Sequence, residues 1–149
     1  MNTRLAVMLP LALSALMIGI AHSPIRLNYT ESLPIGIWRI KPISKIERGT
    51  IVFLHEEGKR RFLKPIAAVA GDTVELRTGK PVTINGKELP NTEAQPKNTP
   101  WPEGKYTVKP GEVWVFSSYN IKSYDSRYFG PLSVSTIEGE AIPLLVMEN

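Results

Sequence analysis

Residues 61–72 read RFLKPIAAVAGD, an apolar run of β-strand character that contains a single lysine. If the run is a strand, its side chains alternate between two faces, and Lys64 shares an apolar face with Phe62 and Ile66. An ammonium ion is out of place there, because desolvation disfavours the charged form and lowers its pKa. Each pKa unit of this shift corresponds to about 1.36 kcal/mol. The amine then becomes a candidate general base near neutral pH. A lysine that snorkels to solvent at a strand end is the alternative.

Short β-branched or aromatic runs, separated by Pro, Gly and Asn, recur on both sides of this stretch, and no sustained helical period follows residue 23. We therefore expect a mostly β domain over residues 24–149. The expected strands are Ile37–Ile40, Thr50–Leu54, Arg61–Val69, Thr73–Leu76, Val82–Ile84, Tyr106–Val108, Glu112–Ser117 and Ile137–Val146, the last broken by Pro143.

Two segments of the domain carry turn and loop signals. The pair Asn85-Gly86, between two short runs, is typical of a two-residue hairpin turn that needs positive φ at both positions. Between Leu89 and Pro110 lie five prolines interleaved with Asn, Thr, Glu and Gly. Because proline cannot donate a hydrogen bond to a neighbouring strand, we expect this segment to be a long surface loop.

The N-terminus has the character of a membrane segment. Residues 5–21, LAVMLPLALSALMIGIA, carry no charge and follow the single cation Arg4. A helix of this length spans roughly 26 Å, slightly less than the roughly 30 Å hydrocarbon core of a bilayer. We expect residues 1–23 to form one transmembrane helix that anchors the protein, with the rest of the chain outside the cytoplasm. A cleavable signal peptide ending near residues 19–21 is the alternative.

The residue composition excludes several kinds of catalytic site. The chain of 149 residues has no cysteine and only two histidines, His22 and His55, neither with a metal-ligand partner three or four residues away. Disulfides, thiolate catalysis and metal sites are therefore not expected, and a serine nucleophile would need a base other than imidazole. The net charge of +4 comes from scattered basic residues, so we expect no nucleic-acid binding. No cofactor is expected.

A candidate nucleophile follows the apolar N-terminus closely. Residues 28–38 read NYTESLPIGIW, which would place Ser32 near the bilayer surface. Pro34 restricts the backbone and Gly36 frees it, so the segment can present Ser32 on an exposed, stiff turn. A polar juxtamembrane linker is the alternative interpretation.

A third segment, residues 123–131, reads SYDSRYFGP. Extended geometry would put Ser123, Asp125 and Arg127 on one face, where the carboxylate and the guanidinium can pair and the hydroxyl can point at another group. A purely structural ion pair is the alternative, although the polar and aromatic groups before a Gly-Pro turn favour a place at the edge of a substrate site.

Together the three segments, in this order behind an apolar N-terminus, resemble the type I signal peptidase superfamily across essentially the whole chain. The matching motifs are Lys64 followed by residues 70–72, Ala-Gly-Asp, and Ser-x-Asp-Ser-Arg-Tyr-x-Gly at residues 123–130. The resemblance implies a signal-peptidase-like β domain behind one transmembrane helix. It also implies a serine endopeptidase activity.

The same resemblance implies a role for each matching residue. Ser32 would be the nucleophile and Lys64 the general base, with the Ser32 backbone N–H and the Thr30 hydroxyl as oxyanion donors. Three further residues would support the site: Ser123, which would hold the lysine amine in position, and Asp125 and Arg127, which would brace it from behind.

Two departures separate the chain from the housekeeping enzymes. Pro34 stands two residues after Ser32 instead of the usual three, and residues 118–120, Ser-Tyr-Asn, replace the usual Gly-Asp-Asn. The form Asn-x-Thr-x-Ser-Leu-Pro-x-Gly and the small domain are similar to the conjugative-transfer signal peptidases (TraF-like). This similarity implies processing of the pilin precursor of a plasmid transfer apparatus, in some systems with cyclisation of the pilin.

The expected partners are a precursor protein, either a pilin or another substrate with a signal peptide, and the lipid bilayer. We expect a monomer in the bacterial inner membrane, with its catalytic domain facing the periplasm. Three alternatives stay open: a housekeeping signal peptidase I, a non-enzymatic pilus-assembly subunit that adds a strand at an open sheet edge, and a self-cleaving Ser-Lys protein.

Overall fold

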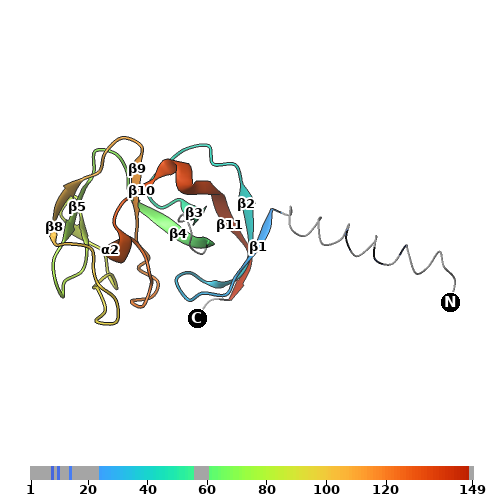
Figure 1. Ribbon diagram of the computed structural model, residues 1–149, viewed down its shortest axis with the longest axis horizontal. Coiled ribbons are helices and arrows are strands. Elements are labelled where there is room, and N and C mark those ends of the chain that lie inside the picture. The colour runs from blue at the N-terminus through green and yellow to red at the C-terminus, as the bar shows by residue number, and fades with distance from the viewer. Residues whose placement is uncertain (1–7, 9, 11–13, 15–23, 56–60, 148–149) are drawn as a thin grey trace.

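The computed structural model describes residues 24–55 and 61–147, together with Met8, Pro10 and Ser14. These residues form two antiparallel sheets, and Figure 1 shows β5 and β8 of the smaller sheet in one lobe and β1, β2, β3 and β11 of the larger sheet in the other. The larger sheet has seven strands in the order β1-β2-β11-β3-β4-β9-β10, and the smaller has four in the order β7-β6-β5-β8. The mostly β architecture expected from the sequence is therefore confirmed.

The strands of the larger sheet are β1 (Ile25–Asn28), β2 (Ile35–Lys41), β3 (Ile51–His55), β4 (Arg61–Ala68), β9 (Glu112–Val115), β10 (Leu132–Ser133) and β11 (Ile137–Met147). Those of the smaller sheet are β5 (Thr73–Leu76), β6 (Thr83–Ile84), β7 (Lys87–Glu88) and β8 (Gly104–Thr107). A short helix, α2 (Ser126–Phe129), and a 3-10 turn, η1 (Val134–Thr136), lie between β9 and β11 along the chain. Every expected run overlaps a strand, whereas β1 and β10 were not expected.

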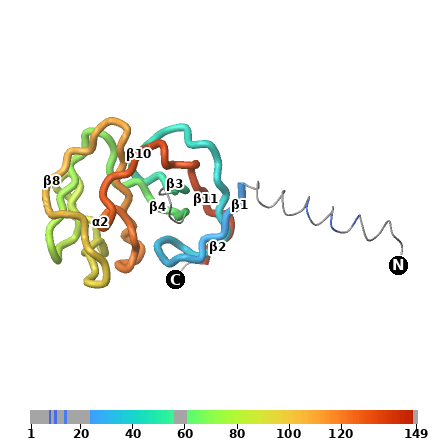
Figure 2. Tube along the Cα trace, viewed as in Figure 1, coloured from blue at the N-terminus to red at the C-terminus, as the bar shows by residue number. Residues whose placement is uncertain are grey.

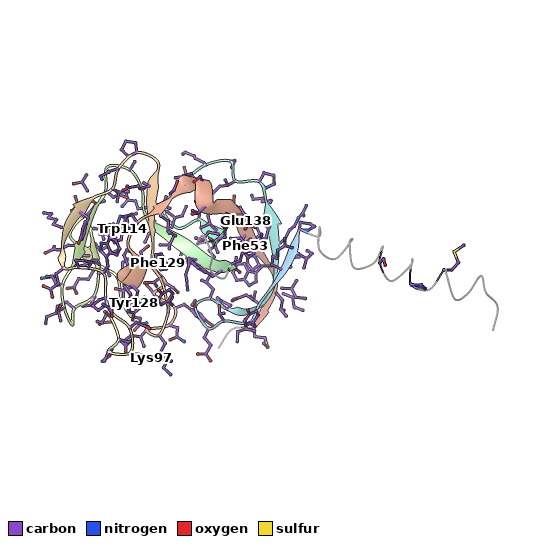
Figure 3. The ribbon with its side chains drawn as sticks, in the orientation of Figure 1. Phe53, Lys97, Trp114, Tyr128, Phe129 and Glu138 are labelled. Atoms are coloured by element: carbon purple, nitrogen blue, oxygen red, sulfur yellow. The ribbon has the colours of Figure 1, made fainter. Side chains whose placement is uncertain are left out.

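Strand β4 contributes to each of the three hydrophobic clusters of the domain. Leu63 packs in a cluster with Phe53, Ile66 packs in a second, and Ala68 packs in a third that contains Trp114. Figure 3 shows Phe53 and Trp114 in the two different lobes. Because β4 is covered on both faces, it links the core of the larger sheet to that of the smaller one.

The turn and loop predictions fare differently. Asn85 and Gly86 have φ values of 50° and 81° and connect β6 to β7, so the hairpin is confirmed. The surface loop expected at residues 89–110 ends before β8, which overlaps the strand expected at Tyr106–Val108 and pairs with β5 at the edge of the smaller sheet. Residues 103–109 contain no proline, so their N–H groups can take part in a ladder. Thr92, in the same segment, is buried.

The first two strands of the domain and the last one lie side by side, as Figure 2 shows. The register between β2 and β11 shifts between Pro143 and Leu145, which agrees with the break expected at Pro143. At Gly36, which has φ +151°, an added Cβ would lie 2.1 Å from the Leu145 carbonyl oxygen. Only glycine permits this approach. The close contact of Gly36 with β11 fixes the chain just after residues 29–34. We call this segment, between β1 and β2, the Ser32 loop.

Among the described residues, no helix is long and apolar enough to cross a lipid bilayer. The expected transmembrane helix at residues 1–23 lies outside the described residues, apart from Met8, Pro10 and Ser14. The anchor therefore stays a prediction, as does the division of the chain into residues 1–23 and 24–149.

Candidate active site

The Ser32 loop is held by Asn28, the last residue of β1 and itself buried. Asn28 Nδ2 donates to the carbonyl oxygens of Thr30, Leu33 and Pro34 at 3.0, 3.1 and 3.0 Å. Its Oδ1 accepts hydrogen bonds from the Thr30 backbone N–H and hydroxyl at 3.2 and 2.8 Å, the pattern of an Asx turn. One amide side chain therefore fixes the backbone on both sides of Ser32.

Hydrophobic packing sets the Ser32 loop beside strand β4. Leu33, which is buried, belongs to the same cluster as Leu63, the residue before Lys64. Within the described chain, the two side chains of the expected dyad do not hydrogen-bond to each other: Lys64 Nζ donates to Ser123 instead. Catalytic hydrogen bonds often close only when substrate is bound, so both residues are kept as candidates.

Strand β4 buries the Lys64 amine, as the alternating pattern predicts. The residue is only 2% exposed, and its Nζ donates to Ser123 Oγ at 2.9 Å and lies 5.8 Å from the centre of the Phe62 ring. Burial lowers the pKa of Lys64 from 10.5 to about 8, while the Asp125 carboxylate acts in the opposite direction and Arg127 in the same one. Removing water from around the ammonium ion disfavours its charged form, which leaves an amine able to take up a proton near pH 8.

The segment around residues 123–127 is not extended, and the expected alternation there is wrong. The Asp125 carboxylate accepts the Arg127 backbone N–H at 3.2 Å and caps helix α2, so the chain turns instead of continuing as a strand. Ser123 reaches Lys64, whereas Asp125 and Arg127 bind each other. The three residues still gather at one place, because the turn brings them together.

Asp125 and Arg127 form a buried, two-pronged ion pair. Arg127 Nε and Nη2 donate to the two carboxylate oxygens at 2.7 and 2.9 Å, and the residues are 0% and 2% exposed. The remaining guanidinium hydrogens go to backbone carbonyl oxygens, including those of Ser117 and Ile121 at 3.0 Å. Such a fully bonded pair holds the surrounding backbone in one geometry.

Two residues of this site were not assigned a role from the sequence. Asn28 was part of the quoted motif, and its position two residues before Thr30 is the available signal, because Asn commonly bonds its own backbone two residues on. Ser117 donates through its hydroxyl to the Ser32 carbonyl oxygen, 85 residues away in sequence. No local pattern indicates a contact of that range.

An open hollow of about 560 Å³ has none of the candidate site residues in its lining. Its lining includes Pro65, which follows Lys64, and Ser118, which follows Ser117. Apolar side chains make up much of the rest, with Arg48 and Lys87 as the cations. In the described part of the chain, no group of three acidic or histidine side chains is placed to hold a metal ion.

The mostly β domain buries the Lys64 amine against the Ser123 hydroxyl. A buried lysine of this kind is what a serine peptidase with a lysine base requires. The family model "Signal peptidase, peptidase S26" matches residues 1–145, and the chain belongs to this family. It is thus a serine peptidase of the signal-peptidase type, and the resemblance seen in the sequence is confirmed.

Known proteins of two kinds are similar to the chain. The conjugal transfer protein TraF of Agrobacterium fabrum is 29% identical over 150 residues, covering 83% of each chain. The probable conjugal transfer protein TraF of Sinorhizobium fredii is 30% identical over 145 residues, covering 80% of this chain and 76% of the relative. The crystal structure of a signal peptidase I from Enterococcus faecalis superimposes with a TM-score of 0.47 and 25% identity, covering 66% of this chain and 97% of that one.

Proposed function

We propose that this peptidase uses Ser32 as nucleophile and Lys64 as general base to cleave a secreted precursor, a conjugative pilin, at the periplasmic face of the inner membrane. The single observation that carries the proposal is the Lys64 amine, buried beside Ser123 with its pKa lowered to about 8. A lysine that is largely protonated in water would not accept a serine proton efficiently, whereas this one has a proton affinity matched to that task.

The reaction proceeds in two stages. Lys64 Nζ takes the hydroxyl proton as Ser32 Oγ attacks the peptide carbonyl carbon, and the protonated amine then passes that proton to the departing amino group. The result is an ester between Ser32 and the substrate, with Lys64 neutral again. Lys64 next deprotonates a water molecule, which hydrolyses the ester and restores the free hydroxyl.

The Ser32 backbone N–H and the Thr30 hydroxyl are proposed to bind the oxyanion of each tetrahedral intermediate. The Thr30 hydroxyl donates to Asn28 Oδ1 at 2.8 Å. A hydroxyl carries one hydrogen, so Thr30 serves the oxyanion only after rotating away from Asn28. Breaking the hydrogen bond to Asn28 reduces the net contribution of the Thr30 hydroxyl.

A membrane location is supported by an apolar patch on the outer face of the larger sheet. Leu27, Ile37 and Leu145 are directly paired across β1, β2 and β11 and are 67%, 36% and 70% exposed. Met147, 61% exposed, extends the patch at its next row. Strand β1 follows the apolar run at residues 5–21 closely in sequence. A contiguous apolar surface beside such a run suits contact with lipid.

The substrate assignment is supported by the relatives named conjugal transfer proteins. For a pilin precursor, the acyl group on Ser32 has two fates. Water releases a linear product, whereas attack by the pilin's own amino terminus forms a new peptide bond and a closed ring. The two products differ in mass by one water molecule.

The test is to incubate the full-length enzyme, in lipid vesicles, with the pilin precursor of a conjugative plasmid and to follow the intact mass of the pilin. We expect shortening of the precursor by the wild type and by Ser44→Ala and Lys97→Met, which alter exposed residues outside the site. Ser32→Ala and Lys64→Met are expected to leave the precursor intact. A product lighter than the linear form by one water indicates cyclisation.

Processing of the precursor by Ser32→Ala at the wild-type rate would contradict the nucleophile assignment. If both Ser32→Ala and Lys64→Met support pilus assembly without any change in pilin mass, the non-enzymatic assembly role is the correct one. Cleavage of general signal-peptide substrates, with the pilin precursor left intact, would instead identify a housekeeping enzyme.

A further inference from the structure

Ser117, just after strand β9, connects the Ser32 loop to the buried ion pair. It is completely buried, and its hydroxyl donates to the Ser32 carbonyl oxygen. Ser117 Oγ also accepts the Tyr119 backbone N–H at 3.3 Å, so the hydroxyl makes one hydrogen bond as donor and one as acceptor. The one hydroxyl hydrogen of Ser117 is therefore committed to the backbone of Ser32.

The backbone of Ser117 is itself fixed from both sides. Its N–H donates to Asp125 Oδ2 at 3.0 Å, and its carbonyl oxygen accepts from Arg127 Nη2 at 3.0 Å. The ion pair that makes these bonds is buried and fully bonded. Ser117 thus links the rigid Asp125–Arg127 ion pair to the backbone of Ser32, the proposed nucleophile.

Four backbone carbonyl groups of the Ser32 loop accept hydrogen bonds from side chains outside the loop. Asn28 binds those of Thr30, Leu33 and Pro34, and Ser117 binds that of Ser32. A hydrogen bond that holds a carbonyl group restricts the ψ angle of that residue. Together, the φ and ψ angles of Ser32 determine where its N–H and its side chain point. Only the Ser117 contact acts on Ser32 directly.

We propose that Ser117 is a positioning residue of the peptidase: its hydroxyl holds the Ser32 carbonyl and thereby aligns the Ser32 Oγ and N–H with Lys64 and the substrate. This inference rests on the proposed function, because it takes Ser32 as the nucleophile. Ser117 transfers no proton, since it contacts a carbonyl oxygen and not the reacting hydroxyl. Loss of its hydroxyl lets the loop shift, and a displacement of about 1 Å costs roughly 100-fold in rate.

The experiment measures acylation of Ser32 by p-nitrophenyl acetate in the full-length protein, which needs no knowledge of the natural substrate. Release of p-nitrophenolate gives kcat and KM, and peptide mass spectrometry locates the acetyl group. For Ser117→Ala we expect kcat to fall about 10- to 100-fold with KM nearly unchanged. The midpoint of the pH–rate profile stays at the wild-type value, because the Lys64 contact with Ser123 is intact.

Ser126→Ala is the matched control. Ser126 is also completely buried, and its hydroxyl accepts the Val115 backbone N–H at 2.9 Å without touching the Ser32 loop. Both variants leave a buried backbone group without its partner, so both are expected to lower the melting temperature. Only Ser117→Ala is expected to lower kcat.

Ser117→Cys keeps the size of the side chain and replaces the hydroxyl with a weaker donor, which guards against misfolding of the alanine variant. We expect its kcat to lie between those of the wild type and Ser117→Ala. Wild-type kcat in both Ser117 variants, or an equal loss of kcat in Ser126→Ala, would show that Ser117 has no positioning role. Ser32→Ala separates the two hypotheses, because its unchanged acylation rate would reject the nucleophile assignment itself.

Discussion

Strand β4 around Lys64 and the turn around Arg127 each bury a cation to the same degree, 2% exposed, yet surround it very differently. All three nitrogens of Arg127 donate hydrogen bonds, to the Asp125 carboxylate and to backbone carbonyl oxygens. Among the described residues, Lys64 Nζ donates one hydrogen bond, to a neutral hydroxyl. A buried charge is tolerated when it is paired and fully bonded. Arg127 meets that condition, and Lys64 does not.

The difference shows that burial alone does not decide what a buried cation does. The guanidinium of Arg127 binds the Asp125 carboxylate and the carbonyl oxygens of Ser117 and Ile121, which is a structural role. The ammonium ion of Lys64 is destabilised by the same burial, its pKa falls to about 8, and the neutral amine becomes accessible for chemistry. The other interactions of the folded domain keep Lys64 buried, although burial destabilises its charged form.

Replacing Lys64 gives the largest expected effect on activity. For Lys64→Met we expect the acylation rate of Ser32 to fall about 100- to 10,000-fold, the contribution of a general base. The measurement is p-nitrophenolate release by the full-length protein. Lys97→Met, an exposed lysine, serves as control and should keep the wild-type rate. A Lys64→Met variant with more than a tenth of the wild-type rate would contradict the assignment.

Replacing Arg127 gives the largest expected effect on stability. Arg127→Met leaves the Asp125 carboxylate buried without its charge partner, which typically costs about 3 to 5 kcal/mol of unfolding free energy. Arg61→Met is the matched control, because Arg61 also bonds a carboxylate, Glu138 at 2.6 Å, but is largely exposed. That variant should lose at most about 1 kcal/mol. Denaturant unfolding monitored by tryptophan fluorescence distinguishes the two, and equal losses would argue against the structural role of Arg127.

Lys64→Met should also make the protein more stable, the opposite of Arg127→Met. A pKa lowered from 10.5 in the unfolded chain to about 8 in the fold corresponds to about 3 kcal/mol of destabilisation while both states are protonated, that is below pH 8. The wild type regains this energy as pH rises from about 8 to 10.5. Unfolding at pH 7 and at pH 10.5 measures both values. A gain that is the same at the two pH values would mean that packing, and not charge, is responsible.

The smallest effect concerns pH and activity. Because Lys64 must be neutral to act as a base, the acylation rate of the wild type should rise about tenfold per pH unit below pH 8 and level off above it. The measurement is the pH–rate profile after subtraction of spontaneous ester hydrolysis. A profile that is flat between pH 6 and 9 would indicate a different base.

Much of the fold follows from local sequence. The strand at residues 73–76 was predicted to the residue, and the turn at Asn85-Gly86 was predicted because few residue pairs adopt positive φ twice in succession. Strand β1 escaped prediction because its sequence, IRLN, has one β-branched residue and two polar ones, and it is the pairing with β2 that makes it a strand. The prediction that residues 123–127 are extended was wrong because the Asp125 carboxylate caps a helical turn. The alternation of polar residues along the sequence does not indicate such a hydrogen bond between side chain and backbone.

The class of chemistry could be predicted from the sequence because the motifs around Ser32, Lys64 and residues 123–130 resemble those of a known peptidase superfamily, and the chain has no usable histidine. The alignment of these parts depends on contacts between distant segments, which the sequence does not reveal. Lys64 meets Ser123, 59 residues away, and Ser117 meets the Ser32 carbonyl, 85 residues away. Such contacts depend on the register of the larger sheet and on the turn at α2. Neighbouring residues determine which face a side chain occupies, but distant strands determine what it meets there.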